Sequence, residues 1–191
     1  MKKKIRIMLL ASSLSTFAGG MFGPIYAVFV ERIGGDLLTA GTAYGAFSIA
    51  AGLLIFILSK WEDHVKHQEN LVVVSYALDI IGFSGYLLMQ KPAHLFIVQV
   101  IFGISEALGS PAFDGIYSKY LDKGKFISEW GVLESMQWIV AAAAAGLGGF
   151  LAMAYGFTYL FVIMLLISIL GFIVSVMLVL GEEEKIIQPH K

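Results

Sequence analysis

The sequence predicts an all-α membrane protein with six transmembrane helices and with both termini in the cytoplasm. Three observations carry this prediction. Of the 191 residues, 58% are hydrophobic and only 14% are charged, whereas soluble domains are about 45–50% apolar and about 25% charged. The apolar residues form six continuous runs, each close to the roughly 20 residues with which a helix crosses a bilayer. The basic residues, finally, gather in alternate loops.

The six spans follow from uncharged runs that charged or turn-forming segments separate. The first run stays uncharged for roughly 24 residues after MKKKIR, so we expect a retained helix and not a cleaved leader. No charge occurs between Glu134 and Glu182, and Gly156 permits a tight hairpin between two crossings there. Strands are not expected, because the runs lack the two-residue alternation of a membrane barrel. The predicted spans are 7–30, 37–58, 71–89, 93–118, 126–153 and 155–180, within a domain of residues 1–181 that a short charged cytoplasmic tail at 182–191 follows.

Charge placement predicts the orientation. With the N-terminus in the cytoplasm, only Arg32 and Lys91 lie outside, as the positive-inside rule requires. The basic residues predicted inside are Lys2, Lys3, Lys4, Arg6, Lys60, Lys66, Lys119, Lys123, Lys125, Lys185 and Lys191.

The order of features resembles half of a major facilitator superfamily transporter, a family with twelve helices in two six-helix halves. The family's loop between helices 2 and 3 carries G-x-x-x-D-R-x-G-R-R, and here residues 59–68 read SKWEDHVKHQ. Asp63 falls on the aspartate of the motif, Ser59 replaces its first glycine, and His64, His67 and Gln68 stand where arginines are usual.

Two further family motifs are altered. The R-x-x-x-G of helix 4 corresponds to QVIFG, in which Gln99 replaces the arginine and Gly103 is kept. The G-P-x-x-G-G of helix 5, associated with antiporters, corresponds to AAGLGG, which keeps only the final glycine pair. The resemblance covers nearly the whole chain, but only one half of a transporter, with one half of the major facilitator fold.

Small residues on helices 2 and 5 predict where a partner packs. The resemblance implies that these helices contact the other half, and small residues let membrane helices approach closely. We expect a homodimer of two chains that lie parallel in the bilayer; the alternative is that the small residues pack within one chain. The predicted dimer interface comprises Gly41, Gly45, Ser48 and Gly52 on helix 2, and Ala141, Ala145, Gly148 and Ala152 on helix 5.

Three acids share the middle of the membrane. At about 1.5 Å per residue, Asp79, Glu106 and Glu134 fall at similar depths, and no Lys, Arg or His falls there with them. A charge at that depth costs about 3 kcal/mol even on the lenient insertion scale. Each acid is therefore protonated, faces a water-filled cavity or binds a cation.

Glu106 is the strongest candidate for a transport role. The resemblance implies that helices 1 and 4 line a central cavity, so we expect Glu106 to carry a proton or bind a cation there, together with Asp79, Glu134 and Gln137. The alternatives are a neutral carboxyl bonded to a neighbouring helix for Glu106, small polar partners for Asp79, and bonds across the dimer seam for Glu134 and Gln137. The expected cavity wall comprises Ser110, Phe113 and Tyr117 on helix 4, and Phe17 and Tyr26 on helix 1.

Asp114 lies nearer the cytoplasmic loops, within expected reach of Lys60 or Lys66. We therefore predict that it forms a structural or gating ion pair, with Asp63 of the loop motif in the same cytoplasmic gate.

No motif of catalysis is present: the sequence lacks a Walker loop, a dinucleotide fingerprint and H-E-x-x-H. We expect no enzyme, cofactor, metal site or nucleic-acid partner. The predicted function is secondary transport of a small cationic or neutral solute across the cell membrane, coupled to an ion gradient, most simply of protons. The alternative is a non-transporting membrane subunit that pairs with a different half.

Overall fold

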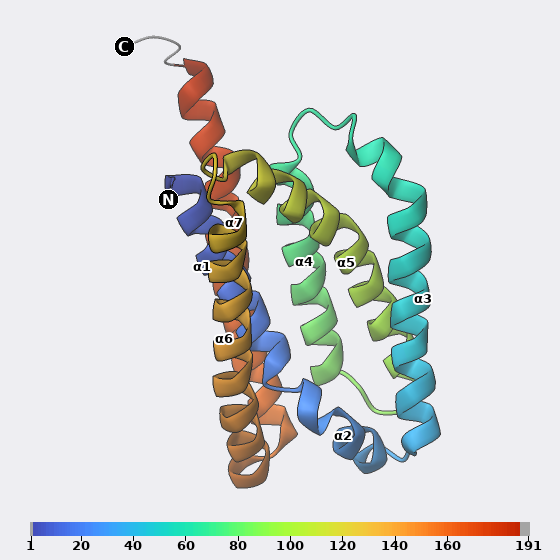
Figure 1. Ribbon diagram of the computed structural model, residues 1–191. Helices are drawn as coiled ribbons and strands as arrows, with labels where there is room; N and C mark the ends of the chain where they lie inside the picture. Colours follow the sequence, from blue (N-terminus) through green and yellow to red (C-terminus); the bar gives the residue numbers. More distant parts are fainter. Residues whose placement is uncertain (1, 188–191) are drawn as a thin grey trace.

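The computed structural model describes residues 2–187, with side chains up to residue 180. Within these residues six helical spans are long and apolar enough to cross a membrane and no strand occurs, which confirms the predicted all-α fold with six membrane-crossing helices. Helix α1 begins and α7 ends at the same end of the bundle (Figure 1). The helices are α1 (Lys3–Gly20), the short 3₁₀ turn η1 (Gly23–Ile25), α2 (Tyr26–Arg32), α3 (Leu37–Glu62), α4 (Glu69–Leu87), α5 (Ala93–Tyr120), α6 (Phe126–Tyr155) and α7 (Phe157–Ile187).

The first span is interrupted, whereas the sequence analysis predicted one continuous helix. Helix α1 ends at Gly20, and the chain passes through η1 before α2 resumes at Tyr26. Pro24 lies within η1, where its missing N–H and its ring disfavour a continuous α-helix. The remaining five spans lie where they were predicted, and several extend a few residues further at their ends.

The hairpin predicted at Gly156 is confirmed. This residue separates α6 from α7 and has φ of +87°, a conformation that L-residues with a side chain rarely adopt. The start of α3, at the same end of the bundle (Figure 1), has a different local feature, an N-cap. The Asp36 carboxylate accepts hydrogen bonds from the Thr39 hydroxyl at 2.6 Å and the Thr39 N–H at 2.7 Å. These bonds lower the pKa of Asp36, which lies outside the spans.

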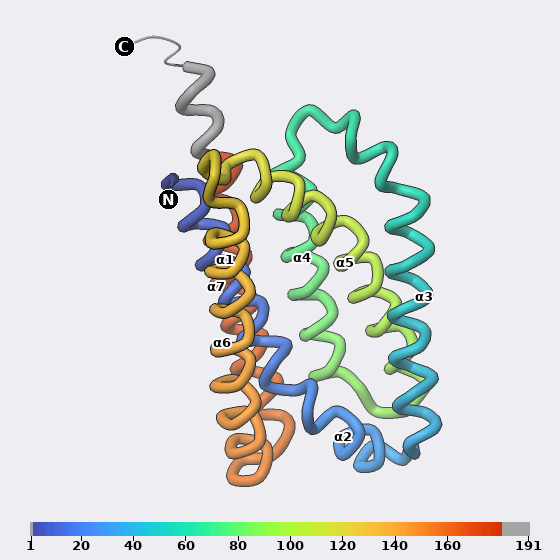
Figure 2. The backbone as a smooth tube through the Cα atoms, viewed as in Figure 1, coloured from blue at the N-terminus to red at the C-terminus, as the bar shows by residue number. Residues whose placement is uncertain are grey.

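Helices α3 and α6 stand at opposite sides of the bundle (Figure 2). Helix α3 packs mainly against α5, and α6 mainly against α1, while α4, α5, α1 and α7 form the continuous centre. Buried side chains form two cores. One surrounds Phe22 and Phe29 near the α6–α7 hairpin, and the other surrounds Met8 and Tyr117 near the start of α1.

Glycines allow the closest helix contacts. A Cβ on Gly103 of α5 would meet the Phe47 carbonyl oxygen of α3 at 2.8 Å. A Cβ on Gly148 of α6 would overlap the backbone of Met21, directly after α1. Small residues at these two positions therefore set the distances between neighbouring helices.

The predicted dimer stripe on α6 is wrong in part. Gly148 is buried against Met21, and Ala141 and Ala152 pack within the chain, the first beside Gly20 and the second against the core around Phe22. The sequence pattern correctly marked a close helix contact but not which helix makes it. The stripe on α3 is different: Gly41, Gly45 and Gly52 have no neighbour within 4 Å of a Cβ, and Gly41, Ser48 and Gly52 are exposed.

Candidate functional site

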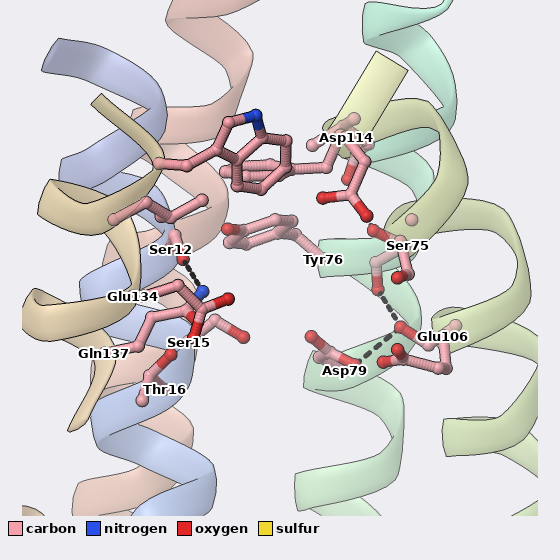
Figure 3. A pocket seen from close by; sticks show the side chains of 17 residues that line it. Ser12, Ser15, Thr16, Ser75, Tyr76, Asp79, Glu106, Asp114, Glu134 and Gln137 are labelled. Atoms are coloured by element: carbon pink, nitrogen blue, oxygen red, sulfur yellow. Dashed lines mark hydrogen bonds between the residues drawn. The ribbon is translucent and has the colours of Figure 1, made fainter. Parts of the chain in front are cut away.

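A cavity of about 400 Å³ lies between α1, α4, α5 and α6. We call it the acidic cavity, because four carboxylates line it and, among the side chains that the structure describes, no Lys, Arg or His does. Figure 3 shows side chains from α1 and α6 facing those from α4 and α5 across the space. Its lining comprises Ser12, Ser15, Thr16, Val72, Ser75, Tyr76, Asp79, Ser105, Glu106, Gly109, Ser110, Phe113, Asp114, Trp130, Leu133, Glu134 and Gln137.

A hydroxyl joins α4 to α5 on one wall of the acidic cavity. The Ser105 Oγ lies 2.6 Å from Asp79 Oδ1 and 2.8 Å from the Ser75 carbonyl oxygen (Figure 3). A hydroxyl has one proton to donate, so the two acceptors share it. This bond fixes the position of the Asp79 carboxyl and places it beside the residue that follows Ser105, which is Glu106.

The opposite wall joins α1 to α6. The Gln137 Nε2 donates to the Ser12 Oγ at 3.1 Å, and Glu134 stands one turn before Gln137 on α6. Glu106, Asp114 and Glu134 are exposed in the single chain, although all three lie on membrane-spanning helices. A carboxyl at such a position faces water or a polar partner and not lipid, because lipid leaves it unsolvated.

A second cavity, of about 370 Å³, meets the acidic cavity at Ser15, Asp79 and Glu106, which line both. We call it the aromatic cavity, because rings from the first span, α3, α4 and α5 dominate its wall. Besides the three shared residues, its lining comprises Gly19, Phe22, Gly23, Tyr26, Tyr44, Phe47, Phe83, Tyr86, Gln99, Phe102 and Met164.

The structure brings together most of the residues that the sequence analysis proposed for transport. Asp79, Glu106, Glu134 and Gln137 all line the acidic cavity, as do the two proposed wall residues Ser110 and Phe113, while Tyr26 lines the aromatic cavity. Their functions stay predictions.

Two of the proposed wall residues lie elsewhere. Tyr117 is fully buried, its hydroxyl donates to the Glu129 carbonyl oxygen at 2.6 Å, and its ring packs on Trp130. It closes the space between α5 and α6 instead of facing a cavity. Phe17 packs against the core around Phe22 and lines neither cavity.

The predicted cytoplasmic gate is not assembled as expected. Asp114 lines the acidic cavity, and among the described residues no ion pair joins it to Lys60 or Lys66. Asp63 directly follows α3 as its C-cap and lies instead in a separate pocket of about 220 Å³, with Lys66 among its lining residues. The prediction failed because Asp114 turns toward the cavity, not toward the loop.

The sequence analysis did not propose several polar residues that line the acidic cavity. Ser75 and Ser105 bridge α4 and α5, and Tyr76 stands one turn before Asp79. A signal was present for two of them. Ser75 precedes Asp79 by four residues, so both lie on one helix face, and Ser105 directly precedes Glu106.

The structure also contains a buried cation, Lys4, which the sequence analysis used only to predict the orientation of the chain in the membrane. Lys4 of α1 forms an ion pair with Glu69 of α4, and the two side chains are 13% and 9% exposed. The Lys4 Nζ also lies 3.2 Å from the Tyr120 hydroxyl and 4.6 Å from the centre of that ring. These contacts tie together α1, α4 and α5 at the end of the bundle where α1 begins.

We expect Glu69→Gln to destabilise the protein by about 3 kcal/mol, because the buried Lys4 ammonium loses its carboxylate partner on α4. In detergent the melting temperature should fall by roughly 6–12 °C. Glu31→Gln is the matched control, since Glu31 is exposed on α2. Equal melting temperatures for the two variants would contradict a stabilising role for the Lys4–Glu69 pair.

Comparison with known proteins gives a consistent result. The model of the Major Facilitator Superfamily matches residues 8–190. The uncharacterized MFS-type transporter YitZ of Bacillus subtilis (strain 168) is 26% identical over 141 residues, which cover 71% of this chain and 82% of that relative. With the six apolar spans, this match shows a multi-pass membrane protein, and 191 residues fit a half-size form. The chain belongs to the major facilitator superfamily, a family of membrane transporters.

Proposed function

We propose that this protein is a secondary transporter of a small cationic or neutral solute that couples solute movement to a proton gradient. One observation supports the proposal: Asp79, Glu106 and Glu134 lie on membrane-spanning helices and line the acidic cavity, and no basic side chain among the described residues lines it with them. A carboxyl in this setting can exchange its proton for a cation as its surroundings change between the two sides of the membrane.

Within this proposal Glu106 is the residue that exchanges the proton. It lines both cavities and is exposed to them, while Asp79 is held by Ser105. Glu134 and Gln137, on the opposite wall, complete the polar path. The lack of basic side chains disfavours an anionic solute, because nothing in the lining would offset its charge.

We propose further that two copies of the chain form the transporter. Glu106, Asp114 and Glu134 are exposed in one chain, so the face that carries them needs a cover that is not lipid. The α3 stripe of Gly41, Ser48 and Gly52 is also open. A second copy would supply another acidic cavity facing the first, in the manner of the parallel repeats of full-length transporters.

The function is tested in proteoliposomes that enclose a pH-sensitive dye. Organic cations, neutral sugars and organic anions are added in turn from outside, with protein-free liposomes as the control. The proposal predicts a change in internal pH with one or more cationic or neutral solutes and none with anions. No change with any solute would favour the alternative, a non-transporting subunit.

Cysteine crosslinking tests the dimer, since the chain contains no cysteine of its own. Ser48→Cys and Ala143→Cys, both at exposed positions on α3 and α6, are made in two separately tagged chains, so that every crosslink is intermolecular. The homodimer predicts crosslinking between the two tags in native membranes. Leu170→Cys, exposed on α7, is the matched control, and a yield no higher than the control's would contradict the dimer.

A further inference from the structure

We propose that the aromatic cavity is the solute site and that it binds a lipophilic organic cation carrying aromatic groups. The inference rests on the proposed function, which it deepens by naming the class of solute and the place where it binds. Three observations carry it: the aromatic wall, the position of the carboxylates and the size of the space.

The wall of the aromatic cavity gathers aromatic rings from several elements. Tyr44 and Phe47 come from α3, with ring centres 5.5 Å apart, and both line the space. Phe102 of α5 also lines it, and its ring is supported by Tyr86 of α4, which stacks on it with centres 5.8 Å apart. Ring faces attract cations that have shed water, and aromatic walls are a recurring means of binding quaternary ammonium groups.

The negative charge lies at one end of this wall. Asp79 and Glu106 line the aromatic cavity where it meets the acidic cavity, and no Lys, Arg or His within the described part of the chain lines it. A ligand in the space therefore has apolar surface along most of its length and carboxylates at one end. An organic cation with aromatic groups matches both features, because its rings stack on the wall and its charge faces the acids.

Other classes of ligand match less well. A volume of about 370 Å³ is in the range of sites for drug-sized molecules and far exceeds what a bare metal ion fills. A sugar needs many hydrogen-bonding partners, whereas the polar groups beyond the carboxylates are few, chiefly Ser15, Tyr26 and Gln99. An anion would meet two carboxylates and no compensating charge.

Binding to the purified full chain in detergent tests the site without any transport step. The probe is radiolabelled tetraphenylphosphonium, and the competitor is triphenylphosphine oxide, an uncharged molecule of related shape. The proposal predicts saturable binding of the probe. The concentration of the uncharged competitor that displaces half of the probe should be at least tenfold higher than that of unlabelled tetraphenylphosphonium. Equal competition by the uncharged molecule would overturn the role of the carboxylates.

Variants locate the bound probe. Glu106→Gln is expected to weaken binding at least tenfold, and Tyr44→Leu about fivefold through the loss of one ring face. Tyr44 is 59% exposed, so its replacement leaves the packed core intact. Tyr159→Leu is the matched control, because Tyr159 is 63% exposed on α7 and lines neither cavity. Affinity losses equal to that of Tyr159→Leu would place the probe elsewhere and overturn the proposal.

The same preparation separates this inference from the proposed function. Saturable cation binding without solute-driven proton movement in proteoliposomes would support the site and contradict the transport cycle. Proton movement driven by a neutral solute, together with no saturable binding of tetraphenylphosphonium, would overturn the site and leave the transport cycle standing.

Discussion

Replacing Glu106 with glutamine is expected to abolish solute-driven proton movement in proteoliposomes. The amide keeps the size of the side chain but neither takes up nor releases a proton between pH 5 and 8. Glu106 lines both cavities and stands, with Ser15 and Asp79, where they meet. The measurement is the initial rate of internal pH change on addition of solute, which should fall to the rate of protein-free liposomes.

Glu31→Gln is the control for this prediction, since Glu31 lies on α2 away from both cavities. Its rate should match that of the unmodified protein. If the Glu106→Gln variant transports at the normal rate and with the normal pH dependence, Glu106 is not the proton carrier. Asp79 or Glu134 would then carry the proton, or transport would not be coupled to protons.

Gly148→Val is expected to prevent folding of the six-helix unit. A Cβ at this position would overlap the backbone of Met21, and backbone cannot turn aside as a flexible side chain can. Helix α6 would then have to move away from α1, its main packing partner. Size-exclusion chromatography in mild detergent should show aggregate in place of a single peak.

Gly146→Val provides the comparison, because Gly146 lies two residues earlier on α6 and has no neighbour within 4 Å of a Cβ. This variant should give the single peak of the unmodified protein. A single peak and an unchanged melting temperature for Gly148→Val would show that the contact between α6 and Met21 is not needed for the fold.

Much of the fold could be predicted because the length and the ends of a membrane helix can be recognised in the sequence. Charged segments bound the spans, and Gly156 marks the hairpin by its conformation. The interruption of the first span had a signal as well, in the glycines and Pro24 of the stretch GGMFGP. That signal was outweighed by the unbroken apolar run, since hydropathy does not distinguish a continuous helix from an interrupted one.

That the three acids would come together could be predicted for a simple reason. A helix rises by a constant amount per residue, so Asp79, Glu106 and Glu134 were expected at one level, and all three line the acidic cavity. Which residues face one another was harder. Ser105 contacts both Asp79 and Ser75 because α4 packs on α5. The spacing of residues within one helix cannot predict such a contact between helices.

The errors have the same origin. Tyr117 shares a helix face with Glu106, but near Tyr117 the neighbouring α6 approaches and buries the ring against Trp130. Gly148 belongs to a stripe of small residues that would suit a partner chain or a neighbouring helix equally well. Helical periodicity gives the direction of a side chain, and only packing gives what it meets.

In the proposed function, the acidic cavity couples a proton gradient to solute movement. The most direct test imposes a pH gradient across the membrane of proteoliposomes. The solute that gives the largest pH change in the transport assay is present at equal concentration inside and outside. Proton coupling predicts that the solute accumulates on one side against its own gradient. Nigericin, with equal potassium concentrations on both sides, dissipates the pH gradient and should abolish this accumulation. A solute concentration that stays equal on both sides while the pH gradient is in place would rule out proton coupling.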